Sequence, residues 1–210
     1  MFDYYEELGM SRIELLERIQ EKVSPSRFQH MLRVEKTAID LAKRFAGNIY
    51  SASLAGILHD YAKDLSDEEF LQLIDKYHLD PELKSWGNAV WHGKVGFLKV
   101  KEDFGLDNNE VLHAIQVHTV GTEEMALLDK ILFVADYIEP GRDFPGVDEA
   151  RELAEESLDA AVAFEAMRTI EYLTNQHQPI YPQTLETYNA YLPGLFHYRE
   201  KLSDHKKSRN

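Results

Sequence analysis

The apolar residues of this chain recur with the spacing of an α-helix almost from end to end. No segment alternates apolar and polar residues as a half-buried strand does, so the pattern limits the chain to an all-α fold. A length of 210 residues suits one domain, and 44% apolar residues are enough to fill its core. We therefore expect a single helical bundle of roughly nine helices over residues 1–202 and a disordered polar tail at 203–210.

Two local signals mark the starts of helices. Ser24 and Pro25 are typical of an N-cap and the first helical residue. Ser66 and Glu69 have the spacing of a capping box. Together with the apolar spacing, these signals predict helices at about 25–46, 49–62, from 66 onward, and at 88–103, 109–118, 123–138 and 147–174, the last of them broken.

The net charge of the chain excludes one class of partner. Lys and Arg number 23 and Asp and Glu number 37, which gives −14 with neutral histidines. Because nucleic acid binding depends on cations that neutralise phosphates, we expect no nucleic acid partner. A small phosphorylated ligand is compatible with this charge if local cations or a metal offset it.

The sequence also indicates a cytoplasmic protein. No stretch approaches the roughly 20 apolar residues that cross a bilayer, so we expect no membrane partner. The first seven residues are acidic and aromatic, unlike a secretory signal.

The chain has no cysteine and nine histidines. Disulfides, thiolate nucleophiles, iron–sulfur clusters and cysteine zinc sites are therefore excluded. Any metal site must use imidazole and carboxylate ligands, which suit iron, manganese, magnesium or an open catalytic zinc.

Four such side chains occur within apolar helical runs. His59 and Asp60 end an uncharged run, His30 lies on an apolar flank of its helix, and Asp136 ends another apolar run. A buried carboxylate is costly unless a cation or hydrogen bonds compensate it. Each residue alone is compatible with a core histidine or a helix cap. The four together favour a catalytic divalent metal.

Two more histidines are candidates for the same site. His92 is followed by Gly93, which lets a ligand approach the backbone. His118 lies near a helix end, five residues after His113. Residues five apart lie on different faces of a helix, so at most one of these two faces the site.

Four cations lie close in sequence to the candidate ligands. Arg27 precedes His30 by one turn, and Lys63 follows His59 and Asp60. Lys94 lies beside His92, and Arg142 follows Asp136 by six residues. A phosphate site needs cations in such places. Each of them is also compatible with an ordinary surface charge.

Five segments carry a family resemblance: Arg27-Phe28-Gln29-His30, Leu58-His59-Asp60-Tyr61-Ala62-Lys63-Asp64, Trp91-His92-Gly93, His118-Thr119 and Ala135-Asp136-Tyr137-Ile138-Glu139-Pro140-Gly141-Arg142. They resemble the HD-domain metal-dependent phosphohydrolases. The H-D-x-A-K and A-D-x-I-E-P-x-R segments look like those of the YqeK family of symmetrical bis(5′-nucleosyl)-tetraphosphatases. The resemblance spans about 24–190 and implies that the bundle is one HD domain.

The resemblance implies a metal-dependent hydrolase that cleaves diadenosine tetraphosphate to two ADP. A metal-bound water would attack the phosphoanhydride. The metal, of iron type, would be held by His30, His59, Asp60 and Asp136, and a second metal could involve His92 and His118.

The expected catalytic residues are Asp60, Lys63 and His92. Asp60 would orient the water, and Lys63 and His92 would stabilise charge on the phosphates. The expected substrate-binding residues are Arg27, Lys63, His92, His118, Thr119 and Arg142. His92 and His118 match either ligands of the second metal or phosphate contacts.

Three other functions are compatible with the sequence. Another HD phosphohydrolase, acting as a nucleotide phosphatase or phosphodiesterase, would use the same metal site. An HD-type di-iron oxygenase would use the same helical shell, and a non-enzymatic nucleotide-binding module would lack stoichiometric metal. Exposed aromatic residues such as Tyr4, Tyr5 and Tyr198 suggest a possible homodimer.

Overall fold

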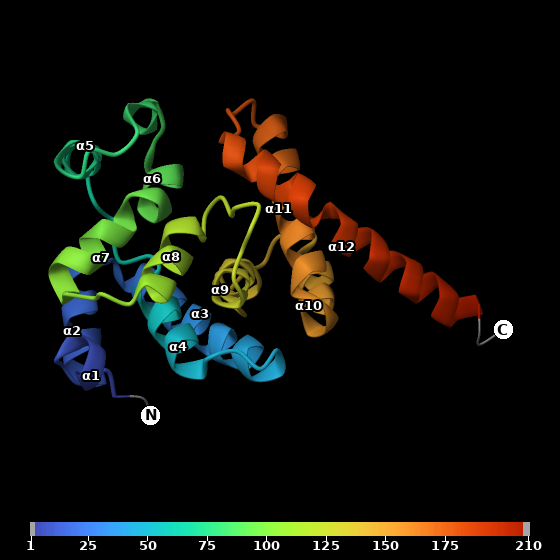
Figure 1. Cartoon of the computed structure of the whole chain (residues 1–210), viewed down its shortest axis with the longest axis horizontal. Coiled ribbons are helices and arrows are strands. Elements are labelled where there is room, and N and C mark those ends of the chain that lie inside the picture. Colours follow the sequence, from blue (N-terminus) through green and yellow to red (C-terminus); the bar gives the residue numbers. More distant parts are fainter. Residues whose placement is uncertain (1–2, 208–210) are drawn as a thin grey trace.

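A computed structural model describes residues 3–207, apart from the side chains of Tyr5 and of residues 201–207. Over this range all regular structure is helical (Figure 1). The elements are α1 (Tyr5–Leu8), α2 (Arg12–Lys22), α3 (Pro25–Arg44), α4 (Ile49–Leu58), α5 (Asp67–Lys76), the 3₁₀ helix η1 (Pro81–Ser85), α6 (Asn88–Lys94), α7 (Gly96–Phe104), α8 (Asn109–Val117), α9 (Leu127–Ile138), α10 (Val147–Glu156), α11 (Leu158–Asn175) and α12 (Pro182–Lys207).

The all-α class is confirmed, but the expected count of roughly nine helices is too low. The described residues form twelve α-helices. Two short helices, α1 and α2, precede Pro25, and the helix expected at 88–103 is divided at Val95. The break expected within 147–174 is confirmed, and it lies at Ser157.

Both predicted helix starts are present in the structure. The Ser24 side chain accepts a hydrogen bond from the Arg27 backbone, with Pro25 at the first helical position. Ser66 and Glu69 form a reciprocal capping box at the start of α5.

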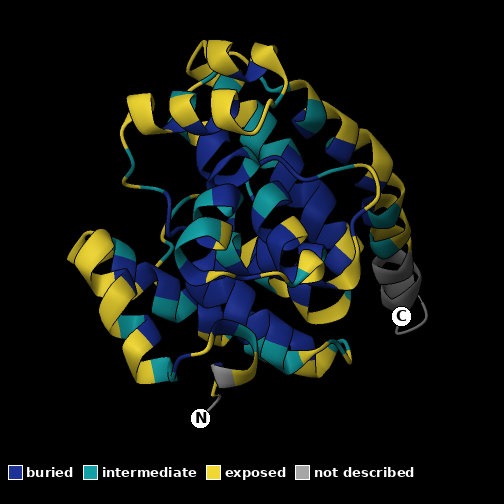
Figure 2. Cartoon of the chain, turned by 60° about the vertical axis from the view of Figure 1, so that its left-hand side comes forward, coloured by how far each residue is buried: buried dark blue, intermediate teal, exposed yellow. Residues whose placement is uncertain are grey.

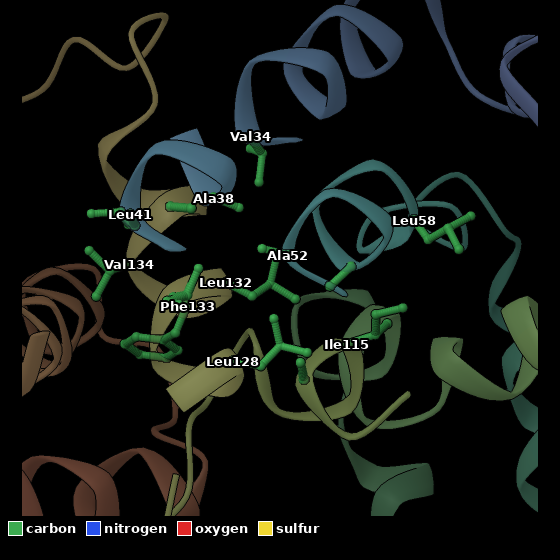
Figure 3. Packing of buried hydrophobic residues seen from close by; sticks show 14 of the residues in the cluster. Val34, Ala38, Leu41, Ala52, Leu58, Ile115, Leu128, Leu132, Phe133 and Val134 are labelled. Atoms are coloured by element: carbon green, nitrogen blue, oxygen red, sulfur yellow. The ribbon is translucent and has the colours of Figure 1, made fainter. Parts of the chain in front are cut away.

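Helix α4 lies at the centre of the fold, and all its residues from Ser51 to Leu58 are buried. Helices α3, α8 and α9 pack around it. Val34, Ala52, Ile115 and Leu132 belong to the core that these four helices share (Figure 3). The buried residues gather in the interior of the molecule, and the exposed residues lie on its outer helices (Figure 2). Each of the four central helices thus buries part of its surface in this core.

Helices α3 and α4 approach each other closely at one glycine. A Cβ atom at Gly56 would lie only 2.7 Å from the Cα atom of Glu35. Any larger residue would push the two backbones apart. This contact sets the distance between α3 and the end of α4, where His59 and Asp60 follow.

The N-terminal segment corrects one premise of the dimer prediction. Tyr4 is fully buried, and its hydroxyl lies 2.6 Å from Ser53 Oγ and donates to Glu35. Tyr198 is partly buried against the core, and the side chain of Tyr5 lies outside the described residues. Tyr4 is therefore not an exposed aromatic residue, and the homodimer stays a prediction.

Helix α12 packs along α11 and then leads away from the other helices (Figure 1). It runs to Lys207, so it overlaps the segment from 203 that was predicted to be a disordered tail, and residues 208–210 lie outside the described range. The boundary at 202 stays a prediction. None of the described helices is both long enough and apolar enough to cross a bilayer.

Candidate metal centre

Six residues predicted to bind metal or phosphate come together around Asp60. They come from three helices and from the short segments that follow α4 and α8. The six are His30 on α3, His59 and Asp60 directly after α4, His92 on α6, His118 directly after α8, and Asp136 on α9. The central packing of α3, α4, α8 and α9 therefore brings residues more than one hundred positions apart into one cluster.

The two oxygen atoms of Asp60 face different histidines. Oδ2 lies 3.5 Å from His30 Nε2 and 3.4 Å from His59 Nε2. Oδ1 lies 3.6 Å from His92 Nε2 and 3.8 Å from His118 Nε2. The carboxylate thus lies between two pairs of imidazoles.

Asp136 contacts the same pair of histidines as Asp60 Oδ2, namely His30 and His59. Its Oδ1 atom lies 2.9 Å from His30 Nε2 and 3.8 Å from His59 Nε2. Arg142 also donates to this atom over 2.5 Å. Burial acts to raise the pKa of Asp136, but His30, His59 and Arg142 hold that pKa below its usual range. The carboxylate is therefore available as a ligand.

The four imidazoles are held in one orientation through their Nδ1 atoms. The Nδ1 atom of His59 lies 2.8 Å from the Gly56 carbonyl oxygen. The Nδ1 atom of His118 faces the Ile115 carbonyl, and that of His92 faces the Asn88 carbonyl. The Nδ1 atom of His30 faces a carboxylate oxygen of Glu139. Carbonyl and carboxylate oxygens only accept, so Nδ1 carries the proton in each ring. Each Nε2 therefore faces the centre, as in histidines that bind metals.

Several polar atoms of the centre are buried without a hydrogen-bond partner. They are Nε2 of His30, His59 and His118, and Oδ1 of Asp60. Such atoms are costly in a protein interior unless something satisfies them. Imidazole nitrogens and carboxylate oxygens lie within 4.8 Å of one another in three overlapping groups, His30-His59-Asp60, His59-His118-Asp136 and Asp60-His92-His118. The residues fit divalent metal ions, which would satisfy these atoms.

His92 differs from the other three histidines because a cation faces its ring. The Lys63 ammonium lies 3.1 Å from Nδ1 and 3.3 Å from Nε2 of this ring. Burial lowers the pKa of His92 to about 3, with Lys63 acting in the same direction and Asp60 opposing it. His92 is therefore neutral, and its Nε2 atom lies near both Lys63 and Asp60.

Two arginines lie at the edge of the cluster. Arg27 pairs with Asp60 Oδ2, and Arg142 pairs with Asp136, while both side chains remain partly exposed. Thr119, another predicted residue, lies beside Gly93, and its buried hydroxyl has no partner. Lys94, by contrast, points away and donates to Gln183. The acidic chain thus carries a local set of cations at this site.

Sequence reasoning gave no role to Glu139. Its carboxylate lies 3.1 Å from His30 Nδ1, and it also accepts from Arg33 over 2.6 Å and from the Gly141 backbone. Burial acts to raise its pKa, but these donors lower it to about 2. Glu139 is ionised and orients His30. Its place in the A-D-x-I-E-P-x-R segment was the available signal.

His113 also lies where the helix geometry predicted. It points away from His118 and contacts Asp129 at 3.0 Å. Only His118 of this pair faces the centre.

Comparison with known proteins agrees with this geometry. A model of the HD domain matches residues 27–141, more than half of the chain, so the chain belongs to the HD domain family.

The relatives define a narrower group within that family. The chain is 40% identical to bis(5′-nucleosyl)-tetraphosphatase, symmetrical, of Halalkalibacterium halodurans, over 87% of this chain and 98% of the relative. It is also 40% identical to the protein of that name from Bacillus subtilis, over 88% of this chain and all of the relative. The crystal structure of a predicted HD superfamily hydrolase involved in NAD metabolism from Clostridium acetobutylicum matches with a TM-score of 0.83 and 33% identity, over 87% of this chain and 97% of that chain.

Proposed function

We propose that the chain is a metal-dependent symmetrical bis(5′-nucleosyl)-tetraphosphatase that hydrolyses diadenosine tetraphosphate to two ADP. The observation that carries this proposal is the position of Asp60 between four oriented imidazoles. It occurs in a chain 40% identical, over most of its length, to two proteins with that name.

The first metal would be held by His30, His59, Asp60 and Asp136. These four residues supply two imidazole nitrogens and two carboxylates, and Asp60 and Asp136 contact the same two histidines. When bound, a divalent metal lowers the pKa of water and neutralises charge on phosphoryl oxygens. Four protein ligands leave coordination positions of such a metal open for water and substrate.

A second metal would use Asp60 Oδ1, His92 and His118. Asp60 offers its second oxygen to these two histidines, and the three form one of the groups with converging ligand atoms. The alternative, that His92 and His118 contact phosphate directly, would leave Asp60 Oδ1 without a partner. We therefore favour the metal role for both.

Arg27, Lys63 and Arg142 would bind the phosphate chain. Arg27 and Arg142 are partly exposed at the edge of the centre, where the substrate must enter. Their guanidinium groups bind phosphoryl oxygens in bidentate fashion. Lys63 lies beside His92 and would stabilise negative charge that develops on the departing ADP. Thr119 would donate its free hydroxyl to the same chain.

Product identification tests the proposal. Purified protein with its metal is incubated with diadenosine tetraphosphate, and the nucleotides are separated by chromatography. ADP as the only product supports the proposal. AMP with ATP would show asymmetrical cleavage, and no turnover of the dinucleotide would contradict the proposal and favour another HD phosphohydrolase. Oxygen consumption without phosphate chemistry would favour the oxygenase.

Several finer predictions accompany this function. We infer that the metal is iron and that the protein works in the cytoplasm, where it binds nucleotide and no nucleic acid. Elemental analysis of freshly purified protein tests the metal, and its mass in solution tests the homodimer.

A further inference from the structure

A pocket lies beside the loop that joins α9 to α10. Its volume is about 480 Å³, within the range of about 300–1,000 Å³ typical of small-molecule sites. It is bounded by the end of α9, the loop before α10 and the last turns of α11. Its lining includes Tyr137, Phe144, Arg168, Tyr172, Asn175 and Gln176.

This pocket adjoins the loop that carries Arg142. Tyr137 directly follows the candidate ligand Asp136, and Phe144 lies two residues after Arg142. A neighbouring hollow that Arg142 lines shares Phe144 and Pro145 with the pocket. The two sites are therefore close enough for one extended ligand to contact both.

The loop that forms one wall is attached to α11. Arg168 donates to the Pro145 carbonyl over 3.1 Å. It also pairs with Glu171 at 2.6 Å. Because Glu171 neutralises this arginine, the pocket offers no free cation for a phosphate group. Its ligand should be the uncharged part of a nucleotide.

The walls have the chemistry of a base-binding site. Tyr137 and Phe144 meet edge to face, with ring centroids 4.8 Å apart, and Tyr172 is 65% exposed at the rim. Aromatic rings of this kind stack on nucleobases. Asn175 and Gln176 add amide groups, each of which can both donate to and accept from the edge of a base.

We propose that this pocket binds one purine nucleoside of the substrate, while the phosphate chain passes Arg142 to the metal centre. The inference rests on the proposed function, because it assigns a place to one end of that substrate. A purine has the larger stacking surface, so the pocket should prefer purine to pyrimidine nucleotides.

Binding of ADP to the metal-loaded protein tests this inference by equilibrium dialysis. Phe144→Ala and Tyr172→Ala should each weaken ADP binding by about tenfold, because each removes an aromatic wall. Binding of inorganic tripolyphosphate, which has no base, should be unchanged. Phe196→Ala and Tyr77→Ala are matched controls, since Phe196 (55% exposed) and Tyr77 (37% exposed) are outside the pocket.

Kinetics and metal content give independent readouts. In the two pocket variants the KM for diadenosine tetraphosphate should rise, with kcat and bound metal unchanged. The inference would be overturned if both variants kept the ADP affinity and the KM of the wild type. It would also be overturned if the wild type did not bind ADP. If the wild type fails to hydrolyse the dinucleotide but ADP binding still depends on Phe144 and Tyr172, the proposed function is wrong and the nucleoside pocket stands.

Discussion

Substitution of Gly56 by alanine should weaken metal binding without touching any ligand. The new Cβ atom would lie 2.7 Å from Glu35 Cα and 3.0 Å from Glu35 N, whereas ordinary contact begins near 3.4 Å. Both facing atoms are backbone atoms, so α3 and α4 must separate by about 0.7 Å. Overpacking of this kind costs about 1–3 kcal/mol, and the helix propensity of alanine offsets about 1 kcal/mol of it.

The separation matters for the site because His30 is on α3 and His59 follows α4. Metal ligands must keep their distances within about 0.2 Å, so we expect metal affinity to fall at least about tenfold and Tm to fall by about 2–4 °C. Competition with a chelator measures the affinity, and circular dichroism measures Tm. Gly87→Ala is the matched control, since its Cβ would meet no atom within 4 Å and its φ is −136°. A Gly56→Ala protein that matches this control in both measurements would refute the reasoning.

Three other predictions follow from the same geometry. Glu139→Gln should lower metal affinity by about 10–100-fold, because the Glu139 carboxylate orients His30; Glu155→Gln, at an exposed glutamate, is the control, and equal affinity in the two variants would contradict this role. Burial raises the pKa of Glu165, so the folded state keeps a proton that the unfolded state loses above about pH 4.5, and stability falls as pH rises. Glu165→Gln should remove this slope and stabilise the protein most near pH 8 in urea unfolding, whereas parallel stability curves would argue against a buried neutral carboxyl. Removal of metal by a chelator should lower Tm, since binding at 100 times Kd contributes about 2.7 kcal/mol, and an unchanged Tm would show that the folded state holds no metal.

The clustering of the candidate ligands was predictable because each of them breaks an apolar pattern. His30, His59, Asp60 and Asp136 place imidazoles and carboxylates where the helical period demands apolar residues. The same reasoning separated His118 from His113, since five helical residues turn the chain to another face. These features depend only on neighbouring residues in the sequence, so they can be predicted without knowledge of the fold.

Features that depend on distant contacts could not be predicted in the same way. Glu139 orients His30 across 109 positions of sequence. The A-D-x-I-E-P-x-R segment singles out Glu139 but does not indicate its partner. The helix expected at 88–103 breaks at Val95, directly before Gly96. A Cβ atom at Gly96 would lie 2.7 Å from Ala62 Cβ, so the close contact that surrounds this break is with a distant residue. Tyr4 has polar neighbours in sequence, yet it is buried, and its hydroxyl forms hydrogen bonds with the distant residues Glu35 and Ser53.

The most direct test of the metal centre is a comparison of Asp60→Asn with Asp148→Asn, since Asp148 has an 89% exposed side chain. Bound metal and release of ADP from diadenosine tetraphosphate are measured on the same preparations. Asp60 contacts all four imidazoles, so we expect Asp60→Asn to lose both metal and hydrolysis while Asp148→Asn keeps both. An Asp60→Asn protein with full metal content and full hydrolysis would contradict the account.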